Sequence, residues 1–311
     1  MAFLVTGGAG FIGSNVVDRL LALNHEVIVL DDFSLGKIEN LSQHRKNKNL
    51  KIVKKSICGN LEKVFNSDIQ AVFHLAALPR VQFSIQKPVE THNANVNGTL
   101  NLLNHCKKSG VKRFIFSSSS SVYGDQKEIL LNESMKPNPL SPYALHKLVG
   151  EQYCSLFNTL FGIEAISLRY FNVYGQRQNP EGNYACLIPK FIKLIHAGEK
   201  PVINGNGDQT RDFTFVEDVV EANILAMQTK NKACFAQAFN IGFGKNHSVN
   251  EVTKMINSRA GKNIAPIHGP AVIEPKHTLA DISKAKEMLG WKPKTALDNG
   301  LEKTFAYFTQ K

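Results

Sequence analysis

Ala2–Gly13, which reads AFLVTGGAGFIG, decides the fold of this chain. Residues 2–6 have the apolar, strand-forming character of a buried strand, and a helical pattern follows the glycines. Spaced glycines between a strand and a helix are typical of a turn whose backbone N–H groups receive a pyrophosphate. In such a turn Gly7 allows the tight bend, Gly10 allows the ligand to come close to the backbone, and Gly13 allows the helix to pack on the strand.

Apolar runs and helical patterns alternate through the rest of the first half, which predicts a parallel sheet covered on both faces. We expect the strands at 2–6, 26–31, 50–53, 70–75, 112–117 and 163–169, and helices at 11–23, 95–109 and 142–161. The second half predicts a strand at 237–241 and helices at 216–228, 248–260, 283–289 and 298–309. The prediction is a doubly wound α/β fold: a Rossmann domain over 1–165, which 212–242 rejoins, and a smaller substrate-binding lobe over 166–311.

Composition restricts the class of protein. The chain has 311 residues, of which 43% are hydrophobic, and a formal net charge of +11. The sequence contains no run of about 18 apolar residues, so we expect no membrane span. Its first residues lack the features of a secretory signal, so we expect none. The five cysteines include no CxxC pair, so we expect neither disulfides nor a metal site. No nucleic-acid motif accompanies the lysines at 46–55, and we expect a cytoplasmic protein without a nucleic-acid partner.

Two acids at the end of the second strand indicate the cofactor. Asp31 lies about 20 residues past the glycine turn, where an acidic residue receives the ribose hydroxyls of a dinucleotide. Asp32 follows directly, and a second negative charge would repel a 2′-phosphate. The sequence therefore predicts NAD rather than NADP, and Asp31 argues against a purely structural turn without a ligand.

A tyrosine and a lysine share one face of a later helix. Ser141 suits the N-cap and Pro142 the first helical position, so Tyr143 and Lys147 lie one turn apart. A neighbouring ammonium and a positively charged nicotinamide would both favour the phenolate. We therefore expect Tyr143 to act as a base near neutral pH.

A run of serines, 117–121, ends a strand whose carboxyl end should face the ligand crevice. One of these hydroxyls is expected to bridge Tyr143 and the substrate. We assign this role to Ser119, with Ser117 and Ser118 close by.

Together these residues resemble the extended short-chain dehydrogenases, and among them the NAD-dependent UDP-hexose 4-epimerases. The resemblance covers nearly the whole chain. Its motifs are Thr6–Ser14, His74–Ala77, Asn95–Thr99, Ser117–Ser119 with Val122–Gly124, Ser141–Tyr143 with Lys147, Arg169–Gly175 and Arg211–Phe213.

The resemblance implies a UDP-sugar 4-epimerase that inverts C4 through a 4-keto sugar. Tyr143 would take the proton of the 4-hydroxyl, Ser119 would hold or relay it, and Lys147 would hold the nicotinamide ribose and lower the pKa of Tyr143. Related dehydratases place an Asp-Glu pair just after the residue that corresponds to Ser119. This chain has Ser120 and Ser121 there, which argues against elimination of water.

The resemblance also implies the residues that contact each ligand. For NAD they are Gly7, Gly10, Phe11, Ile12, Gly13, Asp31, Asp32, Ser34, Gly36, Ile57, Leu75, Ala76, Ala77, Asn95, Ser117, Tyr143, Lys147, Tyr170 and Val173. For the UDP-sugar they are Ser118, Ser119, Asn172, Gln178, Cys186, Leu187, Val202, Asn204, Arg211, Glu274, Lys276 and Thr278.

The same comparison bears on the sugar. Gln178 and Cys186 correspond to positions that line the N-acetyl side in related enzymes, and Thr278 corresponds to a position where a tyrosine excludes a C2 N-acetyl group. A small Thr278 predicts that UDP-GlcNAc and UDP-GalNAc are accepted, with UDP-Glc and UDP-Gal as further substrates. The chain departs from the family at Ala271, where a diphosphate-binding arginine is usual and Lys276 or another lysine would substitute. It departs again at Ser56, where an aspartate that contacts adenine is usual.

Two alternatives remain open. One is another nucleotide-sugar short-chain dehydrogenase, such as a UDP-uronate 4-epimerase, which would need an additional cation near C6 that the sequence alone does not place. A non-catalytic NAD-binding scaffold would not need Tyr143, Lys147 and Ser119. Relatives often form homodimers through two helices, here 95–109 and 142–161, and we expect the same of this chain.

Overall fold

The computed structural model describes residues 2–65, 68–181, 186–271 and 275–310. Its centre is a seven-stranded parallel sheet in the order β12-β7-β5-β4-β1-β2-β3. The strands are β1 (Ala2–Thr6), β2 (Glu26–Asp31), β3 (Leu50–Lys54), β4 (Ile69–His74), β5 (Arg113–Ser119), β7 (Glu164–Tyr170) and β12 (Gln237–Ile241). The expected doubly wound parallel sheet is therefore confirmed.

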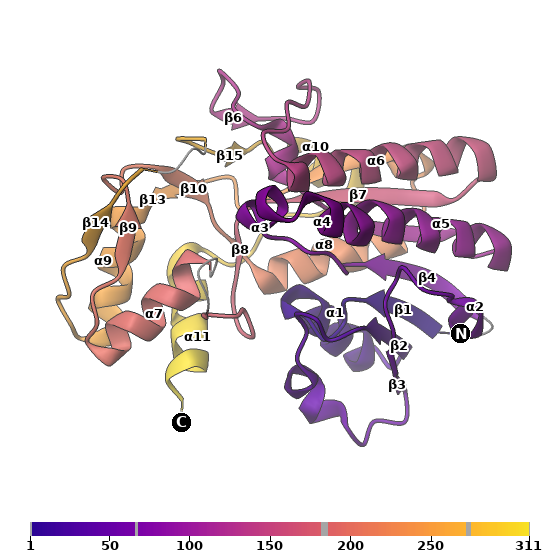
Figure 1. Cartoon of the computed structure of the whole chain (residues 1–311), viewed down its shortest axis with the longest axis horizontal. Helices are drawn as coiled ribbons and strands as arrows, with labels where there is room; N and C mark the ends of the chain where they lie inside the picture. Colours follow the sequence, from indigo (N-terminus) through magenta and orange to yellow (C-terminus); the bar gives the residue numbers. More distant parts are fainter. Residues whose placement is uncertain (1, 66–67, 182–185, 272–274, 311) are drawn as a thin grey trace.

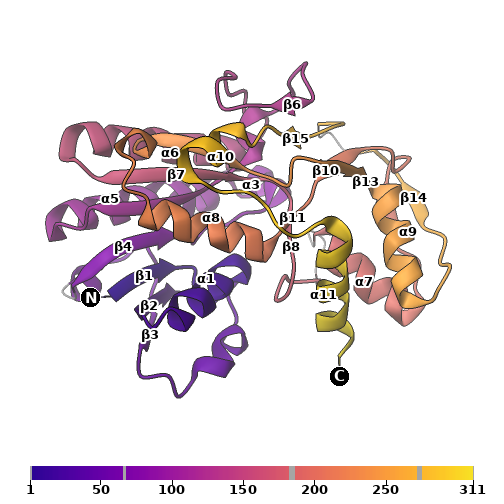
Figure 2. The same ribbon diagram turned by 180° about the vertical axis from the view of Figure 1, so that it is seen from behind.

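Side chains alternate between the two faces of the sheet along each strand, and a separate hydrophobic core forms on each face. In β1, Phe3 and Val5 belong to one hydrophobic cluster and Leu4 to another, because successive side chains point to opposite faces. The first cluster packs under α1 (Phe11–Ala22), α8 (Val216–Gln228) and α10 (Ser283–Leu289). The second packs under α2 (Glu62–Phe65), α5 (Gly98–Ser109) and α6 (Pro142–Phe161). Figure 1 shows α5 and α6 over one face, and Figure 2 shows α8 and α10 on the other.

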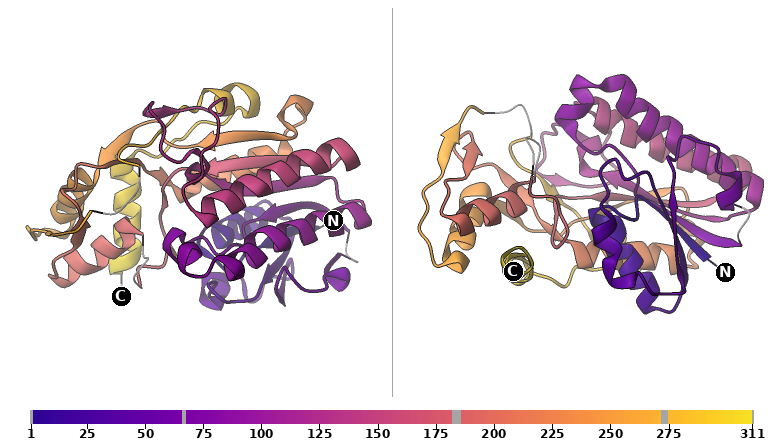
Figure 3. Two further views of the ribbon diagram at one scale, coloured as in Figure 1. Left: turned by 45° about the horizontal axis from the view of Figure 1, so that its top comes forward. Right: turned by 60° about the horizontal axis from the view of Figure 1, so that its bottom comes forward.

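A smaller lobe has a third hydrophobic cluster of its own. It contains α7 (Leu187–Ala197), α9 (Val249–Ala260) and α11 (Leu297–Thr309), with the short pairs β9 (Val202–Asn204) with β14 (Ile267–Gly269), and β10 (Thr210–Asp212) with β13 (Asn246–Ser248). In Figure 3 these orange and yellow segments lie to one side of the indigo and purple sheet. The pairs β6 (Leu130–Leu131) with β15 (Leu279–Ala280) and β8 (Val173–Tyr174) with β11 (Thr214–Phe215) join distant parts of the chain.

The chain crosses between the sheet and the lobe more than once. The boundary expected at residue 165 falls inside β7, because the apolar run that forms this strand continues to Tyr170. The segment 212–242 adds α8 and the edge strand β12, which pairs with β7. The later helix α10 also packs against the sheet rather than in the lobe. The two predicted domains are therefore ranges of sequence, and segments of the second range pack on the sheet of the first.

Three shorter helical segments precede α5 and belong to the region that positions the site. They are α3 (Val81–Gln86), α4 (Pro88–His92) and a π-type turn at Asn93–Asn97. The helix expected over 95–109 thus begins with a π turn, after which α5 is regular. The loop between β4 and α3 lies at the carboxyl edge of the sheet, where ligands bind in doubly wound folds.

Candidate active site

A cleft runs along the carboxyl ends of β1, β2, β4 and β5 and continues to the lobe. The strand order reverses between β1 and β4, which is the position at which a crevice opens in such sheets. Loops from the first half of the chain line one end of the cleft, and segments from 172–180, 204–211 and 275–278 line the other.

Two positions of the glycine turn, Gly7 and Gly13, leave no space for a side chain. Gly7 has φ +67°, and a Cβ on it would lie 2.7 Å from the Ala76 nitrogen. A Cβ on Gly13 would lie 2.1 Å from the Gly7 oxygen, so α1 packs directly on the turn. Gly10 precedes α1 and has no side chain to cap it, which leaves the N–H groups of the first turn for a ligand. This is a cradle of the kind that binds a pyrophosphate.

Asp31 stands at the end of β2, on the floor of the cleft. Its Oδ2 accepts a hydrogen bond from the Ala9 nitrogen at 2.9 Å, and its Oδ1 accepts one from the Phe33 nitrogen at 2.8 Å. Burial raises the pKa of this carboxyl, and the two backbone N–H donors oppose the rise. A Cβ at Gly36 would lie 2.8 Å from Oδ1, so glycine at that position keeps space beside the carboxylate. The arrangement fits a dinucleotide that offers ribose hydroxyls.

Asn95, which the resemblance places at NAD, bonds the backbone of Leu78 instead of lining the cleft. Its Oδ1 accepts from the Leu78 nitrogen at 2.8 Å, and its Nδ2 donates to the Leu78 oxygen at 3.1 Å. The buried amide therefore holds the loop after β4 from behind, and Asn95 is not among the described residues that line the cleft. The other residues expected at the cofactor do line it: Gly7, Gly10, Phe11, Ile12, Gly13, Asp31, Asp32, Ser34, Gly36, Ile57, Leu75, Ala76, Ala77, Ser117, Tyr143, Lys147, Tyr170 and Val173.

Tyr143 lies in the first turn of α6, where two serines fix the backbone. Ser141 caps the helix, since its Oγ accepts from the Ala144 nitrogen at 3.2 Å. Ser84, in α3, accepts from the Tyr143 nitrogen at 3.0 Å and donates to the Val81 oxygen at 2.6 Å. Ser84 was not predicted as a site residue. A serine in a helix that packs against the start of α6 gives no distinctive signal in the sequence.

Ser119 is oriented to donate its proton. Its Oγ accepts from the Ser121 nitrogen at 3.2 Å and from the Ser121 hydroxyl at 2.9 Å. A hydroxyl has two acceptor lone pairs and one proton, so these two bonds leave Ser119 as a donor. The hydrogen bond between Ser119 and Tyr143 lowers the pKa of the phenol, as a donated proton does for a phenolate.

Lys147 is buried and makes a backbone contact. Its Nζ donates to the Ser117 oxygen at 2.6 Å and lies 5.9 Å from the centre of the Tyr143 ring. Burial lowers the pKa of Lys147 to about 8. Burial raises the pKa of Tyr143 to about 12, and the Ser119 hydrogen bond only partly opposes this. The expectation that Lys147 and a positively charged nicotinamide together make Tyr143 a base near neutral pH stays a prediction, since these values describe the chain without NAD.

At the substrate end, several expected residues do line the cleft. They are Ser118, Ser119, Asn172, Gln178, Cys186, Asn204, Arg211 and Thr278. Buried polar atoms without a hydrogen-bond partner among the described residues occur at Gln178 Oε1 and Thr278 Oγ1. Arg211 Nη1 donates to the carbonyl oxygens of Thr210 at 2.9 Å and Lys276 at 3.2 Å.

Ser118 lines the cleft, but its hydroxyl donates to Glu151 in α6, because its side chain points to the face of β5 opposite that of Ser117 and Ser119. Other predicted substrate contacts are placed outside the cleft. Val202 is 47% exposed while its neighbour Ile203 is buried, so the alternation of β9 turns Val202 outward. Leu187 packs against the lobe core. Leu187, Val202 and Lys276 lie outside the described lining of the cleft, and Glu274 falls outside the described residues.

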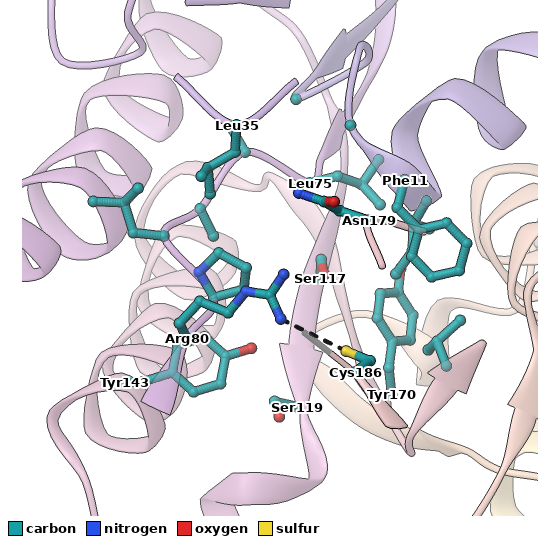
Figure 4. A pocket seen from close by; sticks show the side chains of 18 of the residues that line it. Phe11, Leu35, Leu75, Arg80, Ser117, Ser119, Tyr143, Tyr170, Asn179 and Cys186 are labelled. Carbon is teal, nitrogen blue, oxygen red and sulfur yellow. Dashed lines mark hydrogen bonds between the residues drawn. The ribbon is translucent and has the colours of Figure 1, made fainter. Parts of the chain in front are cut away.

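Arg80 is a cleft residue that the sequence reasoning missed. It sits in the loop after β4, and its Nη1 lies 3.7 Å from the Cys186 sulfur, within hydrogen-bond distance. Figure 4 shows its guanidinium reaching across the cleft beside Tyr143, on the side of Ser119 and Cys186. A basic residue a few positions past a strand's carboxyl end was the signal that could have found it.

The described residues contain neither a membrane-spanning helix nor a group of side chains suited to a metal ion. None of the described helices is long and apolar enough to cross a membrane. Over the same parts of the chain, no group of three or more His, Cys, Asp or Glu side chains could hold a metal ion.

Comparison with known proteins gives the family. The model of the NAD dependent epimerase/dehydratase family matches residues 3–242. The chain superposes with TM-score 0.93 on a UDP-glucose 4-epimerase of Thermotoga maritima solved with UDP-glucose, at 39% identity over 99% of this chain and 98% of that one. For a UDP-N-acetylglucosamine 4-epimerase of Methanobrevibacter ruminantium in complex with UDP-N-acetylmuramic acid, the TM-score is 0.94 at 38% identity, over 99% and 97%.

A third solved structure was determined with its cofactor. A UDP-glucuronic acid 4-epimerase of Bacillus cereus, in complex with UDP-glucuronic acid and NAD, superposes with TM-score 0.91 at 35% identity, over 99% of both chains. This chain therefore belongs to the NAD-dependent epimerase/dehydratase family, and it is an NAD-dependent epimerase. The predicted family and the predicted cofactor are both confirmed.

Proposed function

We propose that this chain is a UDP-sugar 4-epimerase that inverts C4 through a 4-keto sugar. The observation that carries the proposal is the Tyr143–Ser119 pair at the junction of the cofactor and substrate ends of one cleft. NAD, when bound, supplies a hydride acceptor that becomes the donor for the return. The relatives named for 4-epimerisation of UDP-glucose, UDP-N-acetylglucosamine and UDP-glucuronic acid support this reaction class.

The described residues account for the proton of the 4-hydroxyl. Tyr143 would take it as the C4–H bond breaks and return it when C4 is reduced from the other face. Ser119, which Ser121 fixes as a donor, would hold the sugar oxygen or stabilise the phenolate. Ser120 and Ser121 follow in the chain, so no carboxylate stands next to Ser119 to remove a second proton. Epimerisation needs only the first proton, whereas elimination of water needs both.

For the sugar, we propose UDP-GlcNAc and UDP-GalNAc, with UDP-Glc and UDP-Gal as further substrates. Thr278 supports this choice because it is small and lines the cleft. Its buried hydroxyl has no partner among the described residues. Gln178 contributes a second unpartnered oxygen to the same cleft. Polar atoms left without partners in this way are suited to a ligand that brings hydrogen-bonding groups, as an N-acetyl group does.

Thr278→Tyr tests this assignment. We expect kcat/KM for the UDP-GlcNAc and UDP-GalNAc interconversion to fall about a hundredfold, because a phenol ring would occupy the space of the N-acetyl group. The UDP-Glc and UDP-Gal interconversion should change by less than about threefold. Both reactions are measured by chromatography of the products, with Thr278→Ser as the matched small variant. If N-acetyl turnover survives the tyrosine, Thr278 does not select the sugar.

A UDP-uronate is the second candidate, and Arg80 is the observation that favours it. The guanidinium lines the same cleft as Tyr143 and lies 3.7 Å from the Cys186 sulfur, so it supplies a cation within the cleft. A guanidinium binds a carboxylate through two parallel hydrogen bonds, so it would favour a sugar that carries one.

Arg80→Gln distinguishes the two candidates. If the sugar carries a carboxylate, kcat/KM for UDP-glucuronate should fall at least about tenfold, the effect of losing one charge-assisted contact. Turnover of UDP-GlcNAc should fall less, and Arg80→Lys should retain part of the uronate activity. Equal losses for both substrates, measured in parallel assays, would remove the uronate candidate.

We also propose that the chain forms a homodimer through α5 and α6, as the resemblance implies. Three leucines on one side of α6 support this, since Leu145, Leu156 and Leu160 are 50%, 48% and 59% exposed. They lie at helical spacing and form an apolar stripe that a partner helix would cover. The cytoplasmic location stays a prediction.

A further inference from the structure

Arg177 joins three segments that are far apart in the sequence. Its Nη1 donates to the Asn40 oxygen at 3.0 Å, and its Nη2 donates to Asn15 Oδ1 at 2.8 Å and to the Asp18 carboxylate. Only 9% of the Arg177 side chain is exposed. Asn15 and Asp18 belong to α1, and Asn40 belongs to the segment after β2. We call these four residues the Arg177 latch.

Both arms of the latch reach the pyrophosphate cradle. Asn40 Nδ2 donates to the Ala9 oxygen at 2.8 Å, inside the glycine turn. Asn15 Nδ2 donates to the oxygen of Phe11, the first residue of α1, also at 2.8 Å. The latch therefore fixes the segment 34–40, which lines the cleft, against the helix end that would hold the pyrophosphate.

On its other side the latch connects to the substrate end of the cleft. Gln178 and Asn179 follow Arg177 directly and line the cleft. Gln176, just before it, donates through Nε2 to Asn15 Oδ1 at 2.8 Å. Arg177 itself has φ +67°, a left-handed conformation that favours glycine. A residue that bears such strain at a ligand cleft, with both terminal guanidinium nitrogens hydrogen-bonded, is held there by those contacts.

We propose that Arg177 is a positioning residue that retains NAD and couples its retention to the nucleotide-sugar. The latch holds the segment 34–40 against the pyrophosphate cradle, and a ligand that contacts Gln178 or Asn179 would strengthen it. Retention of NAD rests only on the confirmed cofactor, whereas coupling rests also on the proposed function. A ligand at one site can then change affinity at the other, because both sites bias the same contacts.

Asp18 limits the size of the effect. It is 34% exposed on its side chain, and it also contacts His44 Nε2 at 2.8 Å and Gln43 Nε2 at 2.9 Å. Removing Arg177 would leave Asp18 with these partners and with water, so the loss is smaller than for a fully buried ion pair. Lysine cannot replace the planar guanidinium, which reaches Asn40, Asn15 and Asp18 at once.

Release of NAD measures both halves of the proposal. Protein loaded with labelled NAD is chased with excess unlabelled NAD, with and without UDP as the probe for the substrate end. We expect UDP to slow release from the wild-type protein severalfold. Arg177→Met should release NAD about tenfold faster, and UDP should change that rate by less than about twofold. Arg177→Gly, which relieves the left-handed backbone and so favours folding, should behave like Arg177→Met.

The matched control is Arg19→Met, on α1, the helix that carries Asn15 and Asp18. Arg19 pairs with Glu221 at 3.8 Å, and 45% of its side chain is exposed. Its replacement should leave the rate of NAD release unchanged. Wild-type release rates in both Arg177→Met and Arg177→Gly would overturn the retention role. A UDP response that persists in these variants would overturn the coupling. If calorimetry shows that the wild-type protein does not bind UDP, the proposed coupling and the UDP-sugar assignment both fail. The release rates measured without UDP then decide whether Arg177 retains NAD.

Discussion

Tyr143→Phe should lower kcat for the 4-epimerisation at least about a thousandfold, the upper part of the range for loss of a positioned acid–base group. The ring remains, so the fold and the cleft should be kept. NAD binding should change by less than about threefold, because the hydroxyl is the only atom removed. Product formation from UDP-GlcNAc and calorimetry with NAD measure the two quantities in the same preparation.

The matched control is Tyr153→Phe, later on the same helix. Tyr153 packs against the core under α6 and does not line the cleft among the described residues. It should leave turnover near the wild-type value. A Tyr143→Phe protein with substantial activity would contradict the assigned proton transfer, whereas loss of NAD binding would show that the variant is not a clean test.

The same residue predicts a dependence on pH. In the chain alone, burial raises the pKa of Tyr143 to about 12, so the phenol is neutral at pH 7. This value applies with Lys147 in place, 5.9 Å from the centre of the Tyr143 ring. The positive charge of a bound nicotinamide would lower the pKa of the phenol further. We expect kcat/KM to rise with pH until Tyr143 ionises, since the phenolate is the base.

Gly10→Ala should weaken NAD binding about a hundredfold, or about 2.7 kcal/mol. The new Cβ would meet only the Gly7 oxygen, at 3.1 Å, so the protein itself accommodates the methyl group with a small adjustment. The pyrophosphate, which needs the backbone at this point, does not. Calorimetry with NAD measures the affinity, and thermal unfolding without NAD should change by only about 2 °C.

Two other glycines calibrate this prediction. Gly59→Ala is the neutral control, because its Cβ would come no closer than 3.4 Å to the Ser56 oxygen. Gly13→Ala should destabilise the protein outright, since its Cβ would lie 2.1 Å from the Gly7 oxygen. If Gly10→Ala binds NAD as tightly as Gly59→Ala does, the pyrophosphate does not lie on this turn.

The sequence predicted the sheet well because its signals are local. All seven strands coincide with apolar runs that the sequence predicts, including 237–241, although the edge strand β3 contains no buried residue. The glycine turn and Asp31 were predicted for the same reason, since their spacing along the chain is fixed by one strand–turn–helix unit. The return of 212–242 to the sheet was predicted, whereas the return of α10 was not, because it depends on long-range packing.

The direction in which side chains point was predicted less well. Ser118 and Val202 were assigned to the substrate, but the hydroxyl of Ser118 donates to Glu151 and Val202 points outward from β9. Asn95 was assigned to NAD, but it holds the Leu78 loop. Arg80, Ser84 and the Arg177 latch were missed because their contacts join segments that the sequence separates. The burial that raises the pKa of Tyr143 in the chain alone cannot be read from the spacing of Tyr143 and Lys147.

The most direct test of the central claim is to follow a deuterium label at C4 of the UDP-sugar. Wild-type protein with NAD is incubated with 4-deuterated UDP-GlcNAc, and in a parallel reaction with 4-deuterated UDP-Glc. The products are resolved and analysed by mass spectrometry and NMR. We predict that a C4 epimer forms, that it keeps the deuterium at C4, and that no reduced cofactor accumulates. Loss of the label to solvent, accumulation of NADH in step with product, or no epimer from either sugar would contradict the account.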